Sequence, residues 1–205
     1  MKILAIETSC DDTAIAILEV KRGKFTVLSN IVSSQTIHTN YGGVFPMMAK
    51  REHQRNLLPV LTQALQESRL LIRENKQSNR SQKILKKILE KENTLFEQVK
   101  EFLETYKKPG IDLIAVTHGP GLEPCLHVGV NFAKALSYAW NIPVVPVNHI
   151  EAHIVVNFLE NPKIKFPALS LVVSGGHTQL ILVKKIGKYE IIGETLDDAV
   201  GEAYD

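Results

Sequence analysis

The sequence has few cysteines, and none of its apolar runs is long. Its two cysteines, Cys10 and Cys125, are far apart and form no CxxC motif. A disulfide framework is therefore not expected, and we expect the reducing cytoplasm as the location. A membrane-spanning helix needs about 20 consecutive apolar residues, and no run approaches that length. The opening MKILAIETSCDD is too acidic, and its apolar run too short, for a signal peptide.

The excess of positive charge is also small. The chain has 24 Lys and Arg against 22 Asp and Glu, a formal net charge of +2. This balance does not by itself predict nucleic-acid binding, so contacts with a phosphate backbone would require local clusters of Lys and Arg. Hydrophobic residues make up 44% of the 205, which is enough for one large domain or two small lobes.

The first half alternates between patterns typical of strands and of helices. Apolar runs separated by turn residues predict three strands in a meander, and later segments predict a helix, a strand, a helix and a strand. The order is therefore βββαβαβ. The predicted strands lie at 2–7, 13–20, 24–35, 111–117 and 142–149, and the predicted helices at 47–67 and 128–140.

The second half repeats the beginning of the first. Residues 166–196 read as strand, Ser-Gly-Gly turn, strand, glycine turn and strand, and DDAVGEAYD then opens a helix. Each meander has a serine in its first turn, Ser9 and Ser174. This internal similarity predicts two ribonuclease-H-like lobes that face each other across a cleft. Two ordinary hairpins remain the alternative.

An unusual segment, 70–108, interrupts the first lobe. It lacks glycine, is rich in Lys, Glu, Gln and Asn, and places apolar residues at helical spacing. We expect one or two amphipathic helices here. Because Lys and Arg outnumber the acids, the segment is either an arm that faces RNA or a solvated helix face, and composition favours the second reading.

Two histidines four residues apart, in VNHIEAH, form a candidate metal site. On a helix, His149 and His153 lie on the same face and can reach one ion. Two ligands are fewer than the three that proteins usually provide to zinc or iron. Glu151 stands between them on the opposite side of the helix, so the pattern is not the HExxH of zinc proteases.

Two turns are candidates for binding the substrate or doing chemistry on it. In VVSGGHTQL, consecutive glycines let a ligand approach the backbone closely, although Gly-Gly also favours a plain hairpin turn. In ETSCDDT, Asp11 or Asp12 can order a water or a metal near a phosphate, or can satisfy turn amides. The pattern does not separate the two aspartates, and we take Asp11 as the candidate catalytic residue.

Taken together, these motifs resemble a known family. ETSCDDT, YGGVFP, AKREH, GPGLEP, VNHIEAH, LVVSGGHTQL and DDAVGEAYD occur in the order and spacing of the tRNA N6-adenosine threonylcarbamoyltransferases, formerly labelled O-sialoglycoprotein endopeptidases. The resemblance covers nearly the whole chain except 70–108. It implies an α/β, actin-like (ribonuclease-H-like) ATPase fold with a complete first lobe at 1–148 and a truncated second lobe at 149–205.

The resemblance also implies a reaction and its residues. Such enzymes transfer the threonylcarbamoyl group from threonylcarbamoyl-AMP to N6 of the adenosine beside the anticodon, in tRNAs that read codons beginning with A. The histidine pair would bind one divalent metal ion, iron or zinc. Protein partners would include a paralogous actin-like subunit. The residues that would bind the adenylate substrate are Val172, Val173, Ser174, Gly175, Gly176 and Asp205.

The chain departs from the family pattern at three places. Ala152 stands where the family has glycine, and Met47 follows Pro46 where the family has glutamate. Family members also continue well past the position of Asp205, into a part that carries a third metal ligand, an aspartate, and an asparagine of the adenylate site. We therefore expect this chain to be catalytically incomplete by itself.

Three other functions fit parts of the pattern. One is the non-catalytic scaffold paralogue of the same complex, which lacks the histidine pair and the SGGHTQL turn. Another is a metalloprotease, which the placement of Glu151 disfavours. The last is an actin-like sugar or acetate kinase, which shares the fold.

Overall fold

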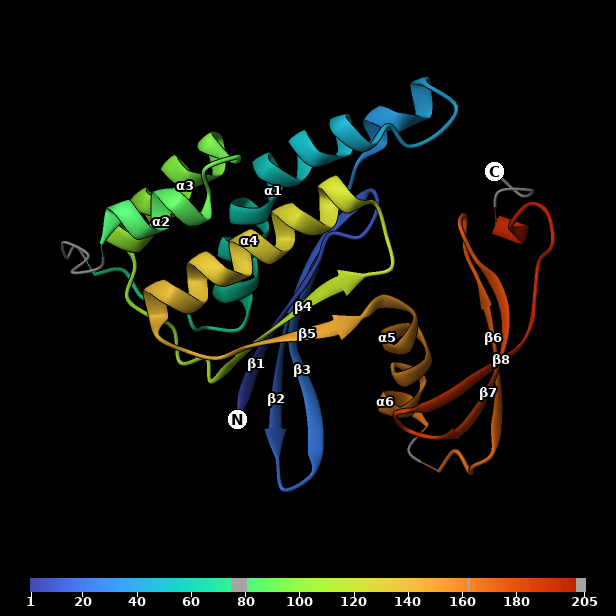
Figure 1. The fold of residues 1–205 in the computed structure, drawn as a ribbon. Coiled ribbons are helices and arrows are strands. Elements are labelled where there is room, and N and C mark those ends of the chain that lie inside the picture. The colour runs from blue at the N-terminus through green and yellow to red at the C-terminus, as the bar shows by residue number, and fades with distance from the viewer. Residues whose placement is uncertain (75–80, 162, 202–205) are drawn as a thin grey trace. The chain divides into compact units, whose positions relative to one another are not determined.

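A computed structural model of the chain describes residues 1–74, 81–161 and 163–201 (Figure 1). The elements form two compact units, Met1–His149 and Ile150–Asp205. Both units combine strands with helices, as the predicted α/β class requires. No helix within the described residues is long and apolar enough to cross a membrane.

The first unit is built on a five-stranded sheet in the order β3-β2-β1-β4-β5. The three N-terminal strands form an antiparallel meander, and β4 and β5 run parallel to β1. This topology confirms the predicted ribonuclease-H-like order. The strands are β1 (Lys2–Glu7), β2 (Asp12–Lys21), β3 (Lys24–Ser34), β4 (Leu113–Gly119) and β5 (Val144–Asn148).

Two long helices, α1 (Pro46–Glu67) and α4 (Glu123–Trp140), cover one side of this sheet (Figure 1). Alternate residues of β1 and β2 pack beneath them in one continuous core. Helix α4 begins at Glu123, earlier than its apolar pattern predicts. Pro124 in the first turn explains the difference, because proline is favoured there and needs no hydrogen-bond partner for its nitrogen.

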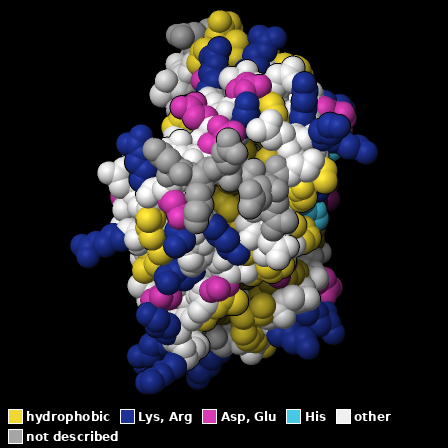
Figure 2. Space-filling model, turned by 90° about the vertical axis from the view of Figure 1, so that its left-hand side faces the viewer, with side chains coloured by type: hydrophobic (Ala, Val, Ile, Leu, Met, Phe, Trp, Pro, Cys, Tyr) yellow, Lys and Arg dark blue, Asp and Glu magenta, His cyan; other side chains and the backbone are white. Residues whose placement is uncertain are grey.

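The inserted segment forms two helices, which confirms the predicted helical character. They are α2 (Gln82–Ile88) and α3 (Asn93–Thr105), and a short 3-10 helix, η1 (Thr36–Asn40), precedes α1. Helix α3 buries Leu95, Phe96, Val99 and Phe102 in the core of the first unit. Figure 2 shows Lys and Arg side chains mixed with Asp and Glu on the face that it presents. The solvated helix face stays a prediction.

The second unit contains a three-stranded antiparallel sheet in the order β6-β7-β8. Its core is small and joins helix α5 to one face of the sheet through Ile154, Val172, Ile181 and Val183. The elements are α5 (His149–Val155), α6 (Asn157–Glu160), β6 (Ala168–Val173), β7 (Thr178–Lys185) and β8 (Lys188–Glu194). The predicted second meander is therefore present.

A buried histidine ties α1 to the turn after β1. The Nε2 atom of His53 lies 2.9 Å from the carbonyl oxygen of Cys10, and its Nδ1 atom lies 2.8 Å from the hydroxyl of Thr13. Because a carbonyl can only accept, Nε2 carries the proton and Nδ1 accepts from Thr13. Burial disfavours a second proton and lowers the pKa of His53 below its ordinary value of 6.5.

This histidine predicts a pH dependence of stability. Below pH 6.5 the unfolded chain binds a proton at residue 53 that the folded chain resists, so His53 makes the free energy of unfolding fall as pH falls from 6.5 toward its folded pKa. Urea unfolding of wild type and His53→Gln across pH 8 to 5 measures the effect. The variant should be less stable at pH 8, by about 1–3 kcal/mol, and should lose less stability on acidification. Parallel pH profiles for the two proteins would contradict the assignment.

Candidate functional site

The candidate site forms where three parallel strands end. Strand β4 pairs with β1 on one side and with β5 on the other, so their carboxyl ends meet at one edge of the sheet. Glu7 is the last residue of β1, Thr117 lies near the end of β4, and His149 directly follows β5. This edge is where open α/β sheets bind ligands.

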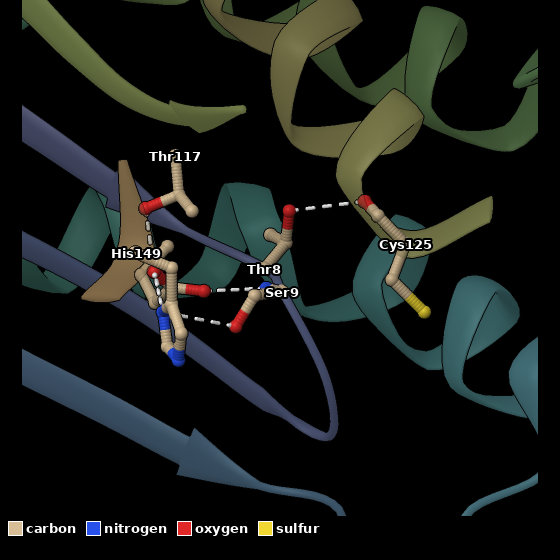
Figure 3. Close-up of polar contacts among 6 residues, drawn as sticks. Thr8, Ser9, Thr117, Cys125 and His149 are labelled. Atoms are coloured by element: carbon tan, nitrogen blue, oxygen red, sulfur yellow. Dashed lines mark hydrogen bonds and ion pairs between the residues drawn. The ribbon is translucent and has the colours of Figure 1, made fainter. Parts of the chain in front are cut away.

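The Glu7 carboxylate is bonded to Ser9, Thr117 and His149, which Figure 3 labels. Its Oε2 atom accepts a hydrogen bond of 2.5 Å from the Thr117 hydroxyl, and its Oε1 atom accepts one from the backbone N–H of Ser9. The Nδ1 atom of His149 lies 3.2 Å from Oε2. Burial by itself would raise the pKa of Glu7, but the hydrogen bonds from His149, Ser9 and Thr117 together lower it from 4.5 to about 2. Glu7 is therefore ionised at neutral pH.

The ionised Glu7 determines which nitrogen of His149 carries a proton. A carboxylate can only accept, so the Nδ1 atom of His149 must donate to it. The Ser9 hydroxyl lies 3.3 Å from the same nitrogen. In the neutral imidazole, Nε2 then holds the lone pair. Metal-binding histidines are commonly oriented in this way by a carboxylate on their other nitrogen.

Close packing of α4 fixes the turn that contains Ser9. The Thr8 hydroxyl donates a 3.0 Å hydrogen bond to the carbonyl of Cys125, and the N–H of Leu122 donates one of 2.7 Å to the carbonyl of Ser9. A Cβ atom at Gly121 would stand 2.6 Å from that carbonyl oxygen, and one at Gly129 would overlap the Thr8 hydroxyl. Gly121 in GPGLEP and Gly129 within α4 therefore permit the close approach of α4.

The second histidine of the pair lies one turn further along α5. His153 is exposed, and its carbonyl accepts a hydrogen bond from Asn157. Glu151 accepts a 2.8 Å hydrogen bond from the hydroxyl of Tyr189. Among residues 1–74, 81–161 and 163–201, no three His, Cys, Asp or Glu side chains converge to hold a metal. The histidine pair would need a further ligand from elsewhere.

The Ser-Gly-Gly turn joins β6 to β7. Val172 is buried, so only its backbone can meet a ligand, whereas Val173 is exposed. The Ser174 hydroxyl accepts a hydrogen bond of 3.0 Å from the N–H of His177. A Cβ atom at Gly175 or Gly176 would meet nothing within 4 Å, and neither residue has a positive φ. The fold of the described residues therefore does not require glycine at these two positions.

The start of the last helix packs against the same turn. A Cβ atom at Gly201 would stand 2.5 Å from the carbonyl oxygen of Ser174 and 2.7 Å from the nitrogen of Gly175. The N–H of Val200 donates a 2.8 Å hydrogen bond to the Thr178 hydroxyl. Asp205, the predicted sugar contact, lies outside the described residues.

Asp11, the predicted catalytic residue, is half-buried in the turn after β1, and its carbonyl accepts a hydrogen bond from Gln35. Within the described part of the chain, its carboxylate is not hydrogen-bonded to Glu7, Ser9 or His149. Sequence reasoning did not identify Glu7 and Thr117 as site residues. The sequence did contain a signal for Glu7, because an acidic residue stands at the end of a predicted strand and directly precedes the candidate turn that contains Asp11.

Comparisons with known proteins give the family of the chain. The family model for tRNA N6-adenosine threonylcarbamoyltransferase matches residues 26–76 and 86–205. Proteins of that name from Persephonella marina and Sulfurihydrogenibium are 44% and 43% identical to the chain over its whole length. The chain covers 48% and 49% of these relatives, so it spans about half of their length.

Solved structures give a weaker likeness. YeaZ from Pseudomonas aeruginosa is 14% identical, with a TM-score of 0.48, over 95% of this chain and 68% of that one. A Ppx/GppA enzyme of Aquifex aeolicus is 11% identical, with a TM-score of 0.45, over 94% and 52%. The sequence matches decide the relationship: the chain belongs to the tRNA N6-adenosine threonylcarbamoyltransferase family.

Proposed function

We propose that this chain provides the N-terminal part of an enzyme that transfers a threonylcarbamoyl group to tRNA. The donor is threonylcarbamoyl-AMP, and the acceptor is N6 of the adenosine next to the anticodon in tRNAs that read codons beginning with A. The observation that carries the proposal is the Glu7–His149 pair at the ends of β1 and β5, in a member of this family. The enzyme would work in the cytoplasm, with a paralogous actin-like subunit as a partner.

His149 and His153 would hold one divalent metal ion, iron or zinc. The residues fit such a group, because Glu7 commits the Nδ1 atom of His149 and directs the lone pair of the ring to Nε2. A third ligand, an aspartate, would come from the second half that the relatives contain. When bound, the ion supplies Lewis acidity toward the carbonyl oxygen of the substrate.

The chain's other residues would orient the substrate. A mixed anhydride is already activated, so the protein needs to place an amine against a carbonyl and to stabilise negative charge that develops on oxygen. Backbone N–H groups of the Ser174–Gly176 turn are suited to that charge, and Asp205 would contact the sugar. Asp11 would order a water or polar group near the phosphate. No covalent nucleophile is needed, and burial raises the pKa of the Cys125 thiol to about 11.

Two alternative functions have less support. A non-catalytic scaffold would not need the histidine pair or the carboxylate that orients His149. A metalloprotease would need Glu151 as a base, but its carboxylate is bound by the Tyr189 hydroxyl.

The transfer reaction can be tested by joining this chain to the second half of the Persephonella relative. Nucleoside mass spectrometry would measure modified adenosine in tRNA, and elemental analysis would measure bound metal. His149→Ala and His153→Ala should each lower activity by at least about 100-fold and reduce metal content, because each removes a direct ligand.

His127→Ala is the matched control, since His127 is exposed on α4. It should leave both quantities unchanged. Undiminished modification by the protein that lacks both His149 and His153 side chains would contradict a metal-binding role for the pair. A joined wild-type protein that contains no metal and does not bind a threonylcarbamoyl-adenylate mimic would favour the scaffold function.

The glycines of the β6–β7 turn give a second test. Because neither Gly175 nor Gly176 is required by the local fold, alanine at either position should change the free energy of unfolding by only about 1 kcal/mol or less. The same variants of the joined protein should bind a non-hydrolysable threonylcarbamoyl-adenylate mimic at least about tenfold more weakly, since a methyl group blocks close approach.

Gly187→Ala is the control for strain. Gly187 has φ +78 in the β7–β8 turn, so alanine there should destabilise the fold and leave binding of the mimic intact. If Gly175→Ala and Gly176→Ala bind the mimic as tightly as wild type does, this turn is not part of the substrate site.

A further inference from the structure

The connection between η1 and α1 carries two aromatic side chains that the fold leaves exposed. We call residues 41–45 the aromatic loop. Tyr41 is 53% exposed and Phe45 is 50% exposed. Their rings contact each other at an angle of 71°, with the ring centroids 5.5 Å apart. An edge-on contact leaves at least one flat face of each ring uncovered by the other ring, so these faces can meet a ligand.

The base of the aromatic loop is fixed, although its rings are exposed. The buried side chain of Gln35 donates a 3.2 Å hydrogen bond to the carbonyl of Ala49 in α1, and its amide oxygen accepts one of 2.9 Å from Nε2 of His38 in η1. The N–H of Tyr41 donates to the carbonyl of His38, and the N–H of Ala49 donates to the carbonyl of Phe45. Because both ends of the loop are held, its rings are positioned before a ligand binds, which reduces the entropy cost of binding.

The aromatic loop lies at the same edge of the first sheet as the Glu7–His149 pair. Strand β3, which leads to the loop, runs parallel to β1, because both strands pair antiparallel with β2. The Sγ atom of Cys125 donates a 3.7 Å hydrogen bond to the carbonyl of Pro46, which directly follows the loop. The carbonyl of Cys125 accepts from Thr8, the residue after Glu7 (Figure 3). A polymer bound at this edge can therefore extend onto the loop.

The charge beside the aromatic loop indicates the kind of ligand. The first turns of α1 follow the loop, and their charged residues are Lys50, Arg51, Glu52 and Arg55. Arg55 is paired with Glu52, and Lys50 with Glu92, whereas Arg51 is exposed. Exposed aromatic rings beside an exposed cation are typical of surfaces that bind single-stranded nucleic acid, because bases stack on the rings and phosphates approach the cation. A second protein can also cover aromatic rings, but the excess of positive charge favours a polyanion.

We propose that Tyr41 and Phe45 stack with unpaired bases of the anticodon loop of the acceptor tRNA, and that Arg51 contacts a phosphate of the same loop. This inference rests on the proposed function, because it names residues that hold the RNA acceptor. Bases in a single-stranded loop can be separated from one another and stacked on aromatic side chains, which bases in a duplex cannot. Tyr41 and Phe45 are positioning residues: they hold the RNA, and no bond forms or breaks at their side chains.

RNA binding by the joined protein tests the stacking. Fluorescence anisotropy would measure the affinity for a labelled RNA hairpin that contains the anticodon loop. Tyr41→Ala and Phe45→Ala should each weaken binding by at least about fivefold, because each removes a stacking surface. Phe45→Leu should weaken binding as much, since leucine is apolar but cannot stack, whereas Phe45→Trp should bind as tightly as wild type. Phe25→Ala is the matched control, because Phe25 is 59% exposed on β3, and it should leave the affinity unchanged.

Two further measurements separate stacking from loss of fold and from general attraction to RNA. The free energy of unfolding of Phe45→Leu should equal that of wild type within about 0.5 kcal/mol, because the side chain is half exposed. A double-stranded RNA of the same length should bind wild type and Phe45→Leu equally. Arg51→Ala should lower the slope of log affinity against log salt concentration for the hairpin by about 0.7, the value for one lost phosphate contact.

Equal affinity of the hairpin for wild type, Tyr41→Ala and Phe45→Ala would overturn this inference and leave the proposed function standing. Full binding by Phe45→Leu would also overturn it, because it would indicate an apolar contact without stacking. Intact RNA binding by Phe45→Ala together with loss of the paralogous subunit would assign the aromatic loop to a protein partner instead. A joined wild-type protein that does not bind the hairpin at all would contradict the proposed function as well.

Discussion

The arrangement of the candidate site depends on the half-buried carboxylate of Glu7. Withdrawing a charge from water costs free energy unless hydrogen-bond donors surround it. Thr117, Ser9 and His149 provide these donors from β4, from the turn after β1 and from the first residue of α5. Burial raises the pKa of Glu7 and these hydrogen bonds lower it. The hydrogen bonds have the larger combined effect, because the pKa is about 2. One side chain thereby holds two strand ends and sets the orientation of His149.

The two meanders share a framework but carry different chemistry. In the first, the residue two places before the serine is Glu7, and the turn is polar and enclosed by α4. In the second, the same place is taken by Val172, which is 7% exposed, and the turn is glycine-rich and open. Under the proposed function, the first turn would orient a metal ligand, and the backbone of the second would meet the substrate. The difference between the two turns begins with a single position, which is Glu7 in the first meander and Val172 in the second.

The fold was largely predictable from the sequence, but the site was only partly so. Strand alternation and helical spacing are local, and they gave the βββαβαβ order, the inserted helices and the helical placement of His149 and His153. Glu7 contacts Thr117 and His149, which are 110 and 142 residues away in the chain. Alternation indicates which face a residue occupies but not which distant strand end lies beside it, so composition pointed to Asp11 instead.

The orientation of His149 by Glu7 can be measured without any bound metal. The nitrogen-15 shifts of the His149 ring, recorded at neutral pH, distinguish a proton on Nδ1 from one on Nε2. The account predicts Nδ1–H in wild type and in Glu123→Gln, whose carboxylate is 86% exposed, and a mixture of both forms in Glu7→Leu. A wild-type ring that carries its proton on Nε2 would contradict the account.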